Sequence, residues 1–294
     1  MDYDKDADDH QGSDGCIDWT HQSNSGLETI WNSNSAMRNV HRNKYSGISK
    51  ADFWIIWAHA ALNYGSQDNV IDMKDLYFWG RKDATVCRES GSRLPSSEGC
   101  QQVEDTFIKR MDLDWAEAVA LMGAHTLGLG HKQFSGHEGK WVPNHRQAIK
   151  FDKGYFEQMV SRAWTPRDNG NGLTDWTTGS KTGEDTNMML NTDLCFFYDI
   201  DDGVPCCTRT DLRRSDGSSR CLKPGLDPRI ATRQCKVIDD THPRWPAARA
   251  SVRYLGGRTA NDNNDPWYND FKKAWTKATM NGHSDLKAMP QTCS

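Results

Sequence analysis

Several kinds of segment are missing from this sequence of 294 residues, and each absence removes a class of protein. No apolar run approaches the length of about 18 residues that crosses a bilayer, so we expect no membrane-spanning helix. The net charge of −4 offers no basic surface to nucleic acid. Met1 is followed by acidic residues rather than by a basic and then an apolar stretch, so no signal peptide is visible. Asn-x-Ser/Thr sites are also missing, so N-glycosylation has no support here.

Cysteine is abundant, but the CxxC spacing of zinc sites does not occur. The nine cysteines are Cys16, Cys87, Cys100, Cys195, Cys206, Cys207, Cys221, Cys235 and Cys293. The cluster from Cys206 to Cys235 favours disulfides that staple a loop-rich, proline-containing insertion over residues 200–260. Cys87 and Cys100 could pair locally, and Cys293 could tie the C-terminal tail to the body. An odd count leaves at least one thiol free or paired between chains, and so many cysteines favour an extracellular protein.

The first 25 residues are polar and rich in aspartate. Asp2, Asp4, Asp6 and Asp8 hint at calcium, but the glycine and glutamate that an EF-hand loop requires are missing. Such a segment buries little apolar surface, so we predict a solvated acidic tail over residues 1–25. Residues 26–294 are then expected to form the folded domain.

The helices can be placed approximately. We predict helices over residues 27–44, 49–64, 101–111 and 265–282, and a loop or short hairpin over 165–187. The clearest is 49–64, where Ser49 is a candidate N-cap. Its expected apolar face consists of Phe53, Ile56, Trp57, Ala60 and Ala61. His59 within it is expected to be a core or rim histidine.

The stretch from Asp114 to Trp141 contains the main candidate metal ligand of the sequence. Asp114 stands at an N-cap position with Glu117 three residues on, which is the spacing of a capping box. An apolar helical run follows, and Gly123 lets a bulky group approach the backbone. His125 ends this run, and an imidazole on an apolar wall suits an axial ligand of haem iron. On these residues alone, a buried core histidine is the commoner interpretation.

Resemblance to a known family favours the iron-ligand interpretation of His125 over the core-histidine interpretation. The segment Ala120 to His131 (ALMGAHTLGLGH) resembles the proximal-histidine segment of the haem peroxidases of plants, fungi and bacteria. The spacing on to Trp141 is similar to the branch that contains cytochrome c peroxidase and ascorbate peroxidase. Met188 to Asp199 resembles the segment with that branch's proximal aspartate, and Asp265 to Gly282 resembles its last core helix. Further matches lie at Gly26-Leu27-Glu28, Ser49 to Leu62, Gly80-Arg81-Lys82-Asp83 and Arg93-Leu94-Pro95.

The resemblance implies a mainly α, two-lobed fold that holds haem b between the lobes. His125 would bind the iron through Nε2, and Asp193 would accept the Nδ1 hydrogen of His125, making the imidazole more electron-donating. Trp141 would lie beside the imidazole as an electron relay or radical site, with simple packing as the alternative.

A cation site is also implied, although the match is poorer. Phe151-Asp152 with Tyr155-Phe156 resembles the FDxxYF segment of ascorbate peroxidases, where residues equivalent to Thr126, Asn144 and Asp152 help to hold a cation. Aligning Asp152 requires a three-residue insertion, and Val142 replaces a threonine ligand. A bound cation, monovalent or divalent, would disfavour positive charge on Trp141.

The distal side departs from the family pattern. Gly12 to Cys16 resembles the segment that follows the distal helix, so the expected Arg-x-x-x-His falls near Tyr3 and Ala7. His10 has no arginine four residues before it. Arg38 and His41 are three residues apart and belong to another predicted helix. The distal helix is therefore rebuilt or absent, or this chain begins late.

These observations predict a haem-dependent peroxidase that uses hydrogen peroxide to oxidise a small electron donor. One alternative is a catalytically impaired, haem-binding pseudo-peroxidase. Another is a secreted structural or matrix protein that retains the fold. Neither nucleic acid nor a membrane is an expected partner.

Overall fold

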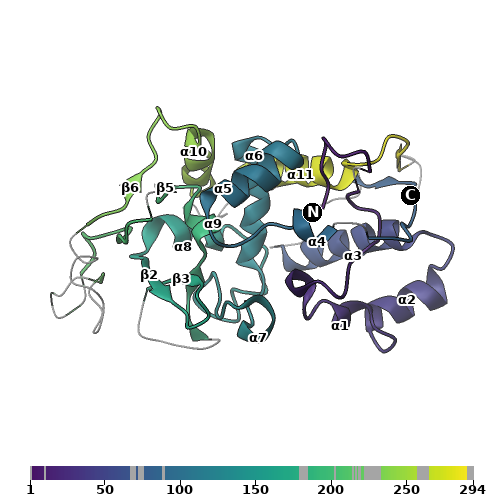
Figure 1. The fold of residues 1–294 in the computed structure, drawn as a ribbon, viewed down its shortest axis with the longest axis horizontal. Helices are drawn as coiled ribbons and strands as arrows, with labels where there is room; N and C mark the ends of the chain where they lie inside the picture. Colours follow the sequence, from purple (N-terminus) through teal and green to yellow (C-terminus); the bar gives the residue numbers. More distant parts are fainter. Residues whose placement is uncertain are drawn as a thin grey trace. The chain divides into compact units, whose positions relative to one another are not determined.

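The computed structural model describes residues 2–9, 11–66, 71, 76–87, 90–178, 185–201, 203–213, 215, 217, 220–221, 233–256 and 265–289. The chain divides into two compact units (Figure 1). The first comprises Met1–Pro95, Asp105–Leu113 and Lys272–Ser294, and the second comprises Ser96–Glu104 and Asp114–Phe271. Helices predominate, as predicted, and strands are short. Within the described ranges, no helix is both long enough and apolar enough to span a bilayer.

The first unit is built mainly from helices near the N-terminus. They are α1 (Glu28–Trp31), α2 (Ala36–Lys44), α3 (Lys50–Gly65) and α4 (Ser90–Arg93). The predicted helix over 27–44 is thus two helices, α1 and α2, because the chain turns at Asn32. A two-stranded sheet pairs β1 (Phe78–Trp79) with β7 (Lys287–Ala288). The Ser49 hydroxyl caps α3 by accepting from the Asp52 amide, as predicted.

The buried face of α3 differs from the predicted one. Ile56 and Trp57 are more than a third exposed, whereas Ile55, His59 and Leu62 are buried. Trp54, Ile55, Ile56 and Trp57 follow one another in the sequence, so apolar residues lie on every side of this helix. Its periodicity therefore could not select the face that packs.

A buried ion pair joins α3 to the segment after β1. Arg81 Nη1 lies 2.9 Å from Asp52 Oδ1, and the two side chains are 1% and 6% exposed. The second oxygen of Asp52 accepts from the Gly80 amide at 2.8 Å, and Arg81 Nη2 donates to the Thr279 carbonyl at 2.8 Å. These bonds connect three separate segments of the first unit, and they compensate the cost of burying two charges.

His59 is the core histidine that the sequence predicts. Trp275 Nε1 donates to its Nε2 at 2.8 Å, which requires an unprotonated nitrogen. Burial, with the nearby positive charge of Arg81, lowers the pKa of His59 to about 4.

This depressed pKa predicts acid destabilisation. Below pH 6.5 the unfolded chain protonates His59 while the folded chain does not, so the free energy of unfolding falls as pH drops from 6.5 towards about 4. The expected loss from this group is about 3 kcal/mol. Urea unfolding of the wild type and of His59→Gln at pH 7 and pH 4.5 measures it. An equal pH dependence in both proteins would contradict the assignment.

The N-terminal segment is not the solvated tail that its composition predicts. Asp2 and Gln11 are buried, and the Gly12 amide donates to Asp2 Oδ1 at 3.2 Å. Cys16 forms a disulfide with Cys87. The prediction was wrong because side-chain partners elsewhere in the first unit, rather than apolar area, hold this segment.

The second unit contains the remaining short helices and two small sheets. Its helices are α5 (Cys100–Val103), α6 (Trp115–Met122), the 3-10 helix η5 (Gly123–Thr126), α7 (Lys132–Ser135), α8 (Gly154–Ser161), α9 (Asn191–Leu194) and α10 (Trp245–Tyr254). One antiparallel sheet has the order β2 (Thr165–Asp168), β3 (Thr174–Thr177) and β4 (Met188–Met189). The hairpin β2–β3 confirms the alternative predicted for residues 165–187. The other sheet pairs β5 (Tyr198–Asp199) with β6 (Lys236–Val237).

Two helices contribute to both units. The predicted helix over 101–111 begins as α5 and continues as a π-helix, η4 (Glu104–Arg110). The predicted C-terminal helix is α11 (Asp265–Met280). Trp267 of α11 belongs to the second unit, and Trp275 belongs to the first.

Gly123 lies at a close approach in the core of the second unit. A β-carbon on Gly123 would come within 2.6 Å of Trp267 Nε1 and 2.8 Å of Phe156 Cζ. Both aromatic side chains are fully buried, and Trp267 Nε1 is fixed by donating to the Ala120 carbonyl at 2.9 Å. The bulky groups that approach this glycine are therefore two core aromatics.

Gly123→Ala should consequently destabilise the protein by about 1–3 kcal/mol, as overpacking of a filled core does. Chemical denaturation measures the loss. Gly47→Ala is the matched control, because nothing lies within 4 Å of its added β-carbon. Equal stability of the two variants would contradict this packing.

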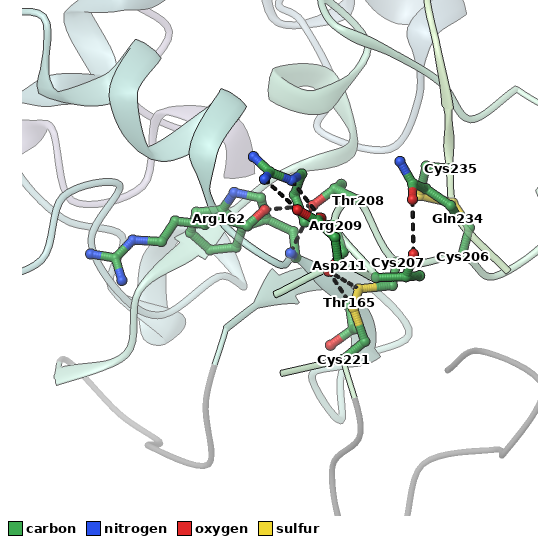
Figure 2. Close-up of a disulfide and its surroundings, with 12 residues drawn as sticks. Arg162, Thr165, Cys206, Cys207, Thr208, Arg209, Asp211, Cys221, Gln234 and Cys235 are labelled. Carbon is green, nitrogen blue, oxygen red and sulfur yellow. Dashed lines mark hydrogen bonds and ion pairs between the residues drawn. A yellow bond between two sulfur atoms is a disulfide. The ribbon is translucent and has the colours of Figure 1, made fainter. Parts of the chain in front are cut away.

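Disulfides link distant segments within each unit. The predicted cluster is confirmed, with pairs Cys206–Cys235 and Cys207–Cys221 (Figure 2). The local pairing of Cys87 with Cys100 was wrong, because Cys87 binds Cys16 and Cys100 binds Cys195. Cys293 lies outside the described residues.

The expected insertion over residues 200–260 is only partly irregular. Figure 2 shows that Thr208, beside the two disulfides, is near Arg162. The Thr208 hydroxyl donates to the Arg162 carbonyl at 2.7 Å and accepts from the Trp164 amide at 2.8 Å. The range also includes α10, whose alanines are buried where it packs on α6. The loop-like part thus ends before Trp245, and α10 belongs to the helical core.

Candidate functional site

The capping box predicted at the start of α6 is present. Asp114 Oδ1 accepts from the Glu117 amide at 2.7 Å, and Glu117 Oε2 accepts from the Asp114 amide at 2.9 Å. The helix is apolar and mostly buried up to Met122, and the chain then tightens into η5. His125 is in this tight turn, so the end of a buried helix fixes its backbone.

The following segment returns the chain so that Trp141 lies beside His125. Gly130 and Gly139 pair as an antiparallel bridge, which closes the loop around α7. The rings of His125 and Trp141 are stacked, with centroids 4.2 Å apart and planes inclined by 26°. Two residues sixteen positions apart in sequence thus form one aromatic pair.

Asp193 is the centre of the cluster. Its side chain is fully buried and comes from α9. His125 Nδ1 lies 2.8 Å from Oδ1, while Trp141 Nε1 donates to Oδ2 at 2.7 Å. The Leu190 amide also donates to Oδ2, at 2.7 Å, and Tyr155 donates its hydroxyl to Oδ1 at 3.0 Å. Four donors on one carboxylate offset the cost of burying its charge.

These bonds define the state of the imidazole. Because Nδ1–H of His125 donates to Asp193, the lone pair of a neutral ring lies on Nε2. Among the described residues, no group forms a hydrogen bond with Nε2, and the side chain is 31% exposed. The arrangement leaves one imidazole nitrogen available to a metal, with its other nitrogen oriented by a carboxylate, which is the usual support of a histidine ligand.

Tyr155 is a further member of this cluster, and its place there was not predicted from the sequence. The only signal for it was the FDxxYF resemblance, which pointed to a cation site. Burial, followed by the adjacent charge of Asp193, raises the pKa of Tyr155 well above its ordinary value. The phenol therefore remains a neutral donor to the carboxylate.

Tyr155→Phe should remove one charge-assisted hydrogen bond and destabilise the fold by about 1.5–3 kcal/mol. Tyr198→Phe is a suitable control, because the hydrogen-bond partners of the Tyr198 hydroxyl, the Val160 carbonyl at 3.5 Å and the Thr208 side chain, are neutral. Urea unfolding of both variants tests the prediction. A loss for Tyr155→Phe no larger than for Tyr198→Phe would count against it.

The three residues considered for a cation are only partly brought together. Thr126 Oγ1 donates to Asp152 Oδ1 at 3.3 Å, and both side chains are largely buried. Burial raises the pKa of Asp152, partly opposed by the hydrogen bond from the Gly154 amide. Asn144 is exposed and exchanges hydrogen bonds with Gln147 instead.

The positions considered for distal groups do not form a catalytic pair in the described residues. Residues 2–9 consist of turns and extended chain, so Tyr3 and Ala7 are not on a helix, and His10 lies outside the described residues. Arg38 and His41 are on α2, as predicted, where the ring nitrogen Nε2 of His41 contacts the Ile48 carbonyl at 3.0 Å.

Comparisons with known proteins agree with this geometry. The family model described as peroxidase matches residues 10–202. L-ascorbate peroxidase 3 of Arabidopsis thaliana is 30% identical over 141 residues, which are 48% of this chain and 45% of that protein. Cytosolic L-ascorbate peroxidase 1 of Oryza sativa subsp. indica is 29% identical over 48% of this chain and 52% of its own. A Pyricularia oryzae protein whose name includes the words heme-binding peroxidase is 40% identical over 36% of this chain and 35% of its own.

The chain spans about half or less of the length of these relatives. The family match, in contrast, covers most of the chain, and it includes the segments that carry His125, Trp141 and Asp193. The chain therefore belongs to the haem peroxidase superfamily, in the branch that contains ascorbate peroxidase and cytochrome c peroxidase.

Proposed function

We propose that this protein is a haem peroxidase, in which Nε2 of His125 binds the iron of haem b and hydrogen peroxide oxidises a small electron donor. The observation that carries the proposal is the open Nε2 on a ring whose Nδ1 is bonded to the buried Asp193. If His125 were an ordinary core histidine, we would expect both of its ring nitrogens to be hydrogen-bonded within the protein.

The residues present fit this cofactor. A neutral imidazole supplies the nitrogen ligand, and the charge on Asp193 increases electron donation from the ring. When bound, haem supplies the iron centre that exchanges electrons with peroxide and with the donor. Trp141 would relay an electron, a role supported by the stacking of its ring on His125 and by the bond from its Nε1–H to the same carboxylate.

The proposal extends to a cation and to a compartment. Thr126 and Asp152 would supply two oxygens to a cation. The charge of this cation would offset that of the Asp152 carboxylate. Four disulfides favour an oxidising environment, so we include secretion in the proposal.

A second candidate is a haem-binding protein with impaired catalysis. It is favoured by the lack of a helix in residues 2–9 and by the position of Arg38 and His41 on α2. Acid–base transfer by a distal group typically contributes about 10²–10⁴-fold, so its loss would spare haem binding but not turnover.

Peroxide-dependent oxidation of guaiacol and of ascorbate by the haem-loaded protein separates the two candidates. The peroxidase proposal predicts turnover that is lost in His125→Ala. Haem binding without turnover above that of free haem would contradict the first candidate and support the second.

A further inference from the structure

The second unit contains another cluster of acid–base side chains, which shares no hydrogen bond with the His125 cluster. His137 Nδ1 lies 2.5 Å from Asp175 Oδ1, and His137 Nε2 lies 2.7 Å from Ser97 Oγ. His137 and Asp175 are buried, whereas Ser97 is partly exposed. A serine, a histidine and an aspartate are thus joined in one hydrogen-bonded line.

Three separate segments hold these side chains in place. Ser97 precedes α5, His137 follows α7, and Asp175 is on β3. The His137 amide donates to Ser135 Oγ at 3.3 Å, which fixes the backbone of the histidine. Asn169 Nδ2 also reaches Asp175 Oδ1, at 3.4 Å.

The buried aspartate sets the direction of the hydrogen bonds. With Nδ1–H donating to Asp175, a neutral His137 presents the lone pair of Nε2 to Ser97, so Nε2 is an acceptor for the serine hydroxyl. The same order of donors and acceptors activates the nucleophile in serine hydrolases of unrelated folds, and it is recognised by geometry rather than by sequence position.

We propose that Ser97, His137 and Asp175 form a second catalytic site, in which Ser97 is the nucleophile towards uncharged aryl esters of carboxylic acids. This activity goes beyond the proposed haem function and requires no haem.

The neighbouring cavity indicates the substrate class. Glu98 and Gly99, which directly follow Ser97, line a cavity of about 740 Å³ together with Trp115 and Trp176, and Glu98 Oε1 connects this lining to Ser97 Oγ at 3.0 Å. The two tryptophan rings suit an aromatic group. The lining carries Glu98 and Glu104, while its Arg244 is paired with Asp201 at 2.8 Å, so the remaining charge is negative and disfavours an anionic ester.

Glu98 also contacts the cluster. Its Oε1 lies 3.0 Å from Ser97 Oγ and 3.9 Å from His137 Nε2. The single hydroxyl proton of Ser97 thus has two acceptors, Glu98 Oε1 and His137 Nε2, and attack requires the rotamer in which the proton points to His137. The charge of Glu98 in turn stabilises the imidazolium that forms when His137 takes the proton.

Hydrolysis of the ester at Ser97 consumes only water. Ser97 Oγ forms a bond to the carbonyl carbon while its proton passes to His137 Nε2. The carbon–oxygen bond to the phenol breaks, and the leaving phenolate takes that proton. Water then loses a proton to His137 and attacks the acyl-serine, which releases the carboxylic acid and returns the proton to Ser97.

A fluorophosphonate probe on the haem-loaded protein tests the proposal. Ser97 Oγ replaces fluoride on phosphorus, and hydrogen fluoride leaves, so the probe marks an activated serine. Peptide mass spectrometry should locate the label on Ser97, and Ser97→Ala should remove it. Ser96→Ala is the matched control, because the exposed Ser96 hydroxyl accepts from the Glu98 amide at 3.4 Å and is not part of the Ser97–His137–Asp175 line, so its loss should leave labelling unchanged.

Hydrolysis of 4-nitrophenyl acetate gives a second readout. His137→Gln should slow it by about 10²-fold or more, as loss of a general base does, and Ser97→Ala should do the same while leaving the haem absorption unchanged. Label found equally on Ser96, or ester hydrolysis that survives in Ser97→Ala, would overturn the proposal. Peroxidase turnover tests the haem function separately.

Discussion

Asp193→Ala should lower the haem affinity or the peroxide turnover of the protein by about 10–100-fold, the usual effect of removing the partner of a histidine ligand. The carboxylate holds the Nδ1 proton of His125, the indole of Trp141 and the phenol of Tyr155. Its loss frees the imidazole to rotate and makes Nε2 a weaker donor. Haem titration and peroxide kinetics measure the two effects.

The variant Asp193→Asn removes the negative charge of the side chain while nearly keeping its shape, so it tests the contribution of the charge alone. The amide keeps the size of the side chain and one acceptor oxygen, but it cannot accept from donors on both sides. We expect haem binding to be retained better than in Asp193→Ala, with the iron reduction potential shifted upward because the imidazole donates less. An unchanged potential together with unchanged turnover would show that Asp193 has no influence on the ligand.

Arg81→Met should destabilise the protein by about 3–5 kcal/mol, because it leaves the charge of Asp52 buried without its partner. Asp52 is 6% exposed, and after the change its described hydrogen bond is the one from the Gly80 amide. The carbonyls of Phe78 and Thr279 would also lose the guanidinium. Thermal or urea unfolding measures the loss.

A surface ion pair provides the comparison for Arg81. Lys5 Nζ lies 3.4 Å from Asp112 Oδ1, and both side chains are well exposed. Lys5→Met should therefore cost no more than about 1 kcal/mol. In the double variant Asp52→Asn/Arg81→Met, part of the stability should return, because no unpaired charge remains. Equal losses for Arg81→Met and Lys5→Met would contradict the role assigned to the buried pair.

Local signals in the sequence predicted local structure well. The N-cap of α3 at Ser49 and the capping box of α6 depend on side chains within three residues of the backbone that they cap. The place of His125 at the end of an apolar helix follows from the same short-range pattern. The face that α3 buries could not be predicted in this way, because Trp54 to Trp57 are all apolar.

Pairings between distant segments were beyond the reach of sequence patterns. Cys16–Cys87 and Cys100–Cys195 join residues 71 and 95 positions apart, and spacing favours only near neighbours. Asp193 could be placed beside His125 because a family resemblance covered both segments. No resemblance or motif joined Ser97, His137 and Asp175, since their proximity depends on how a loop, a turn and a strand pack.

The absorption spectrum of the haem-loaded protein, compared with that of His125→Ala, tests most directly whether His125 binds the iron. The wild type should give a ferric Soret band that changes on addition of hydrogen peroxide. His125→Ala should lose this spectrum and regain it with added imidazole, which can occupy the vacated space and supply the missing nitrogen. An identical spectrum in wild type and His125→Ala, with or without imidazole, would show that the iron ligand lies elsewhere.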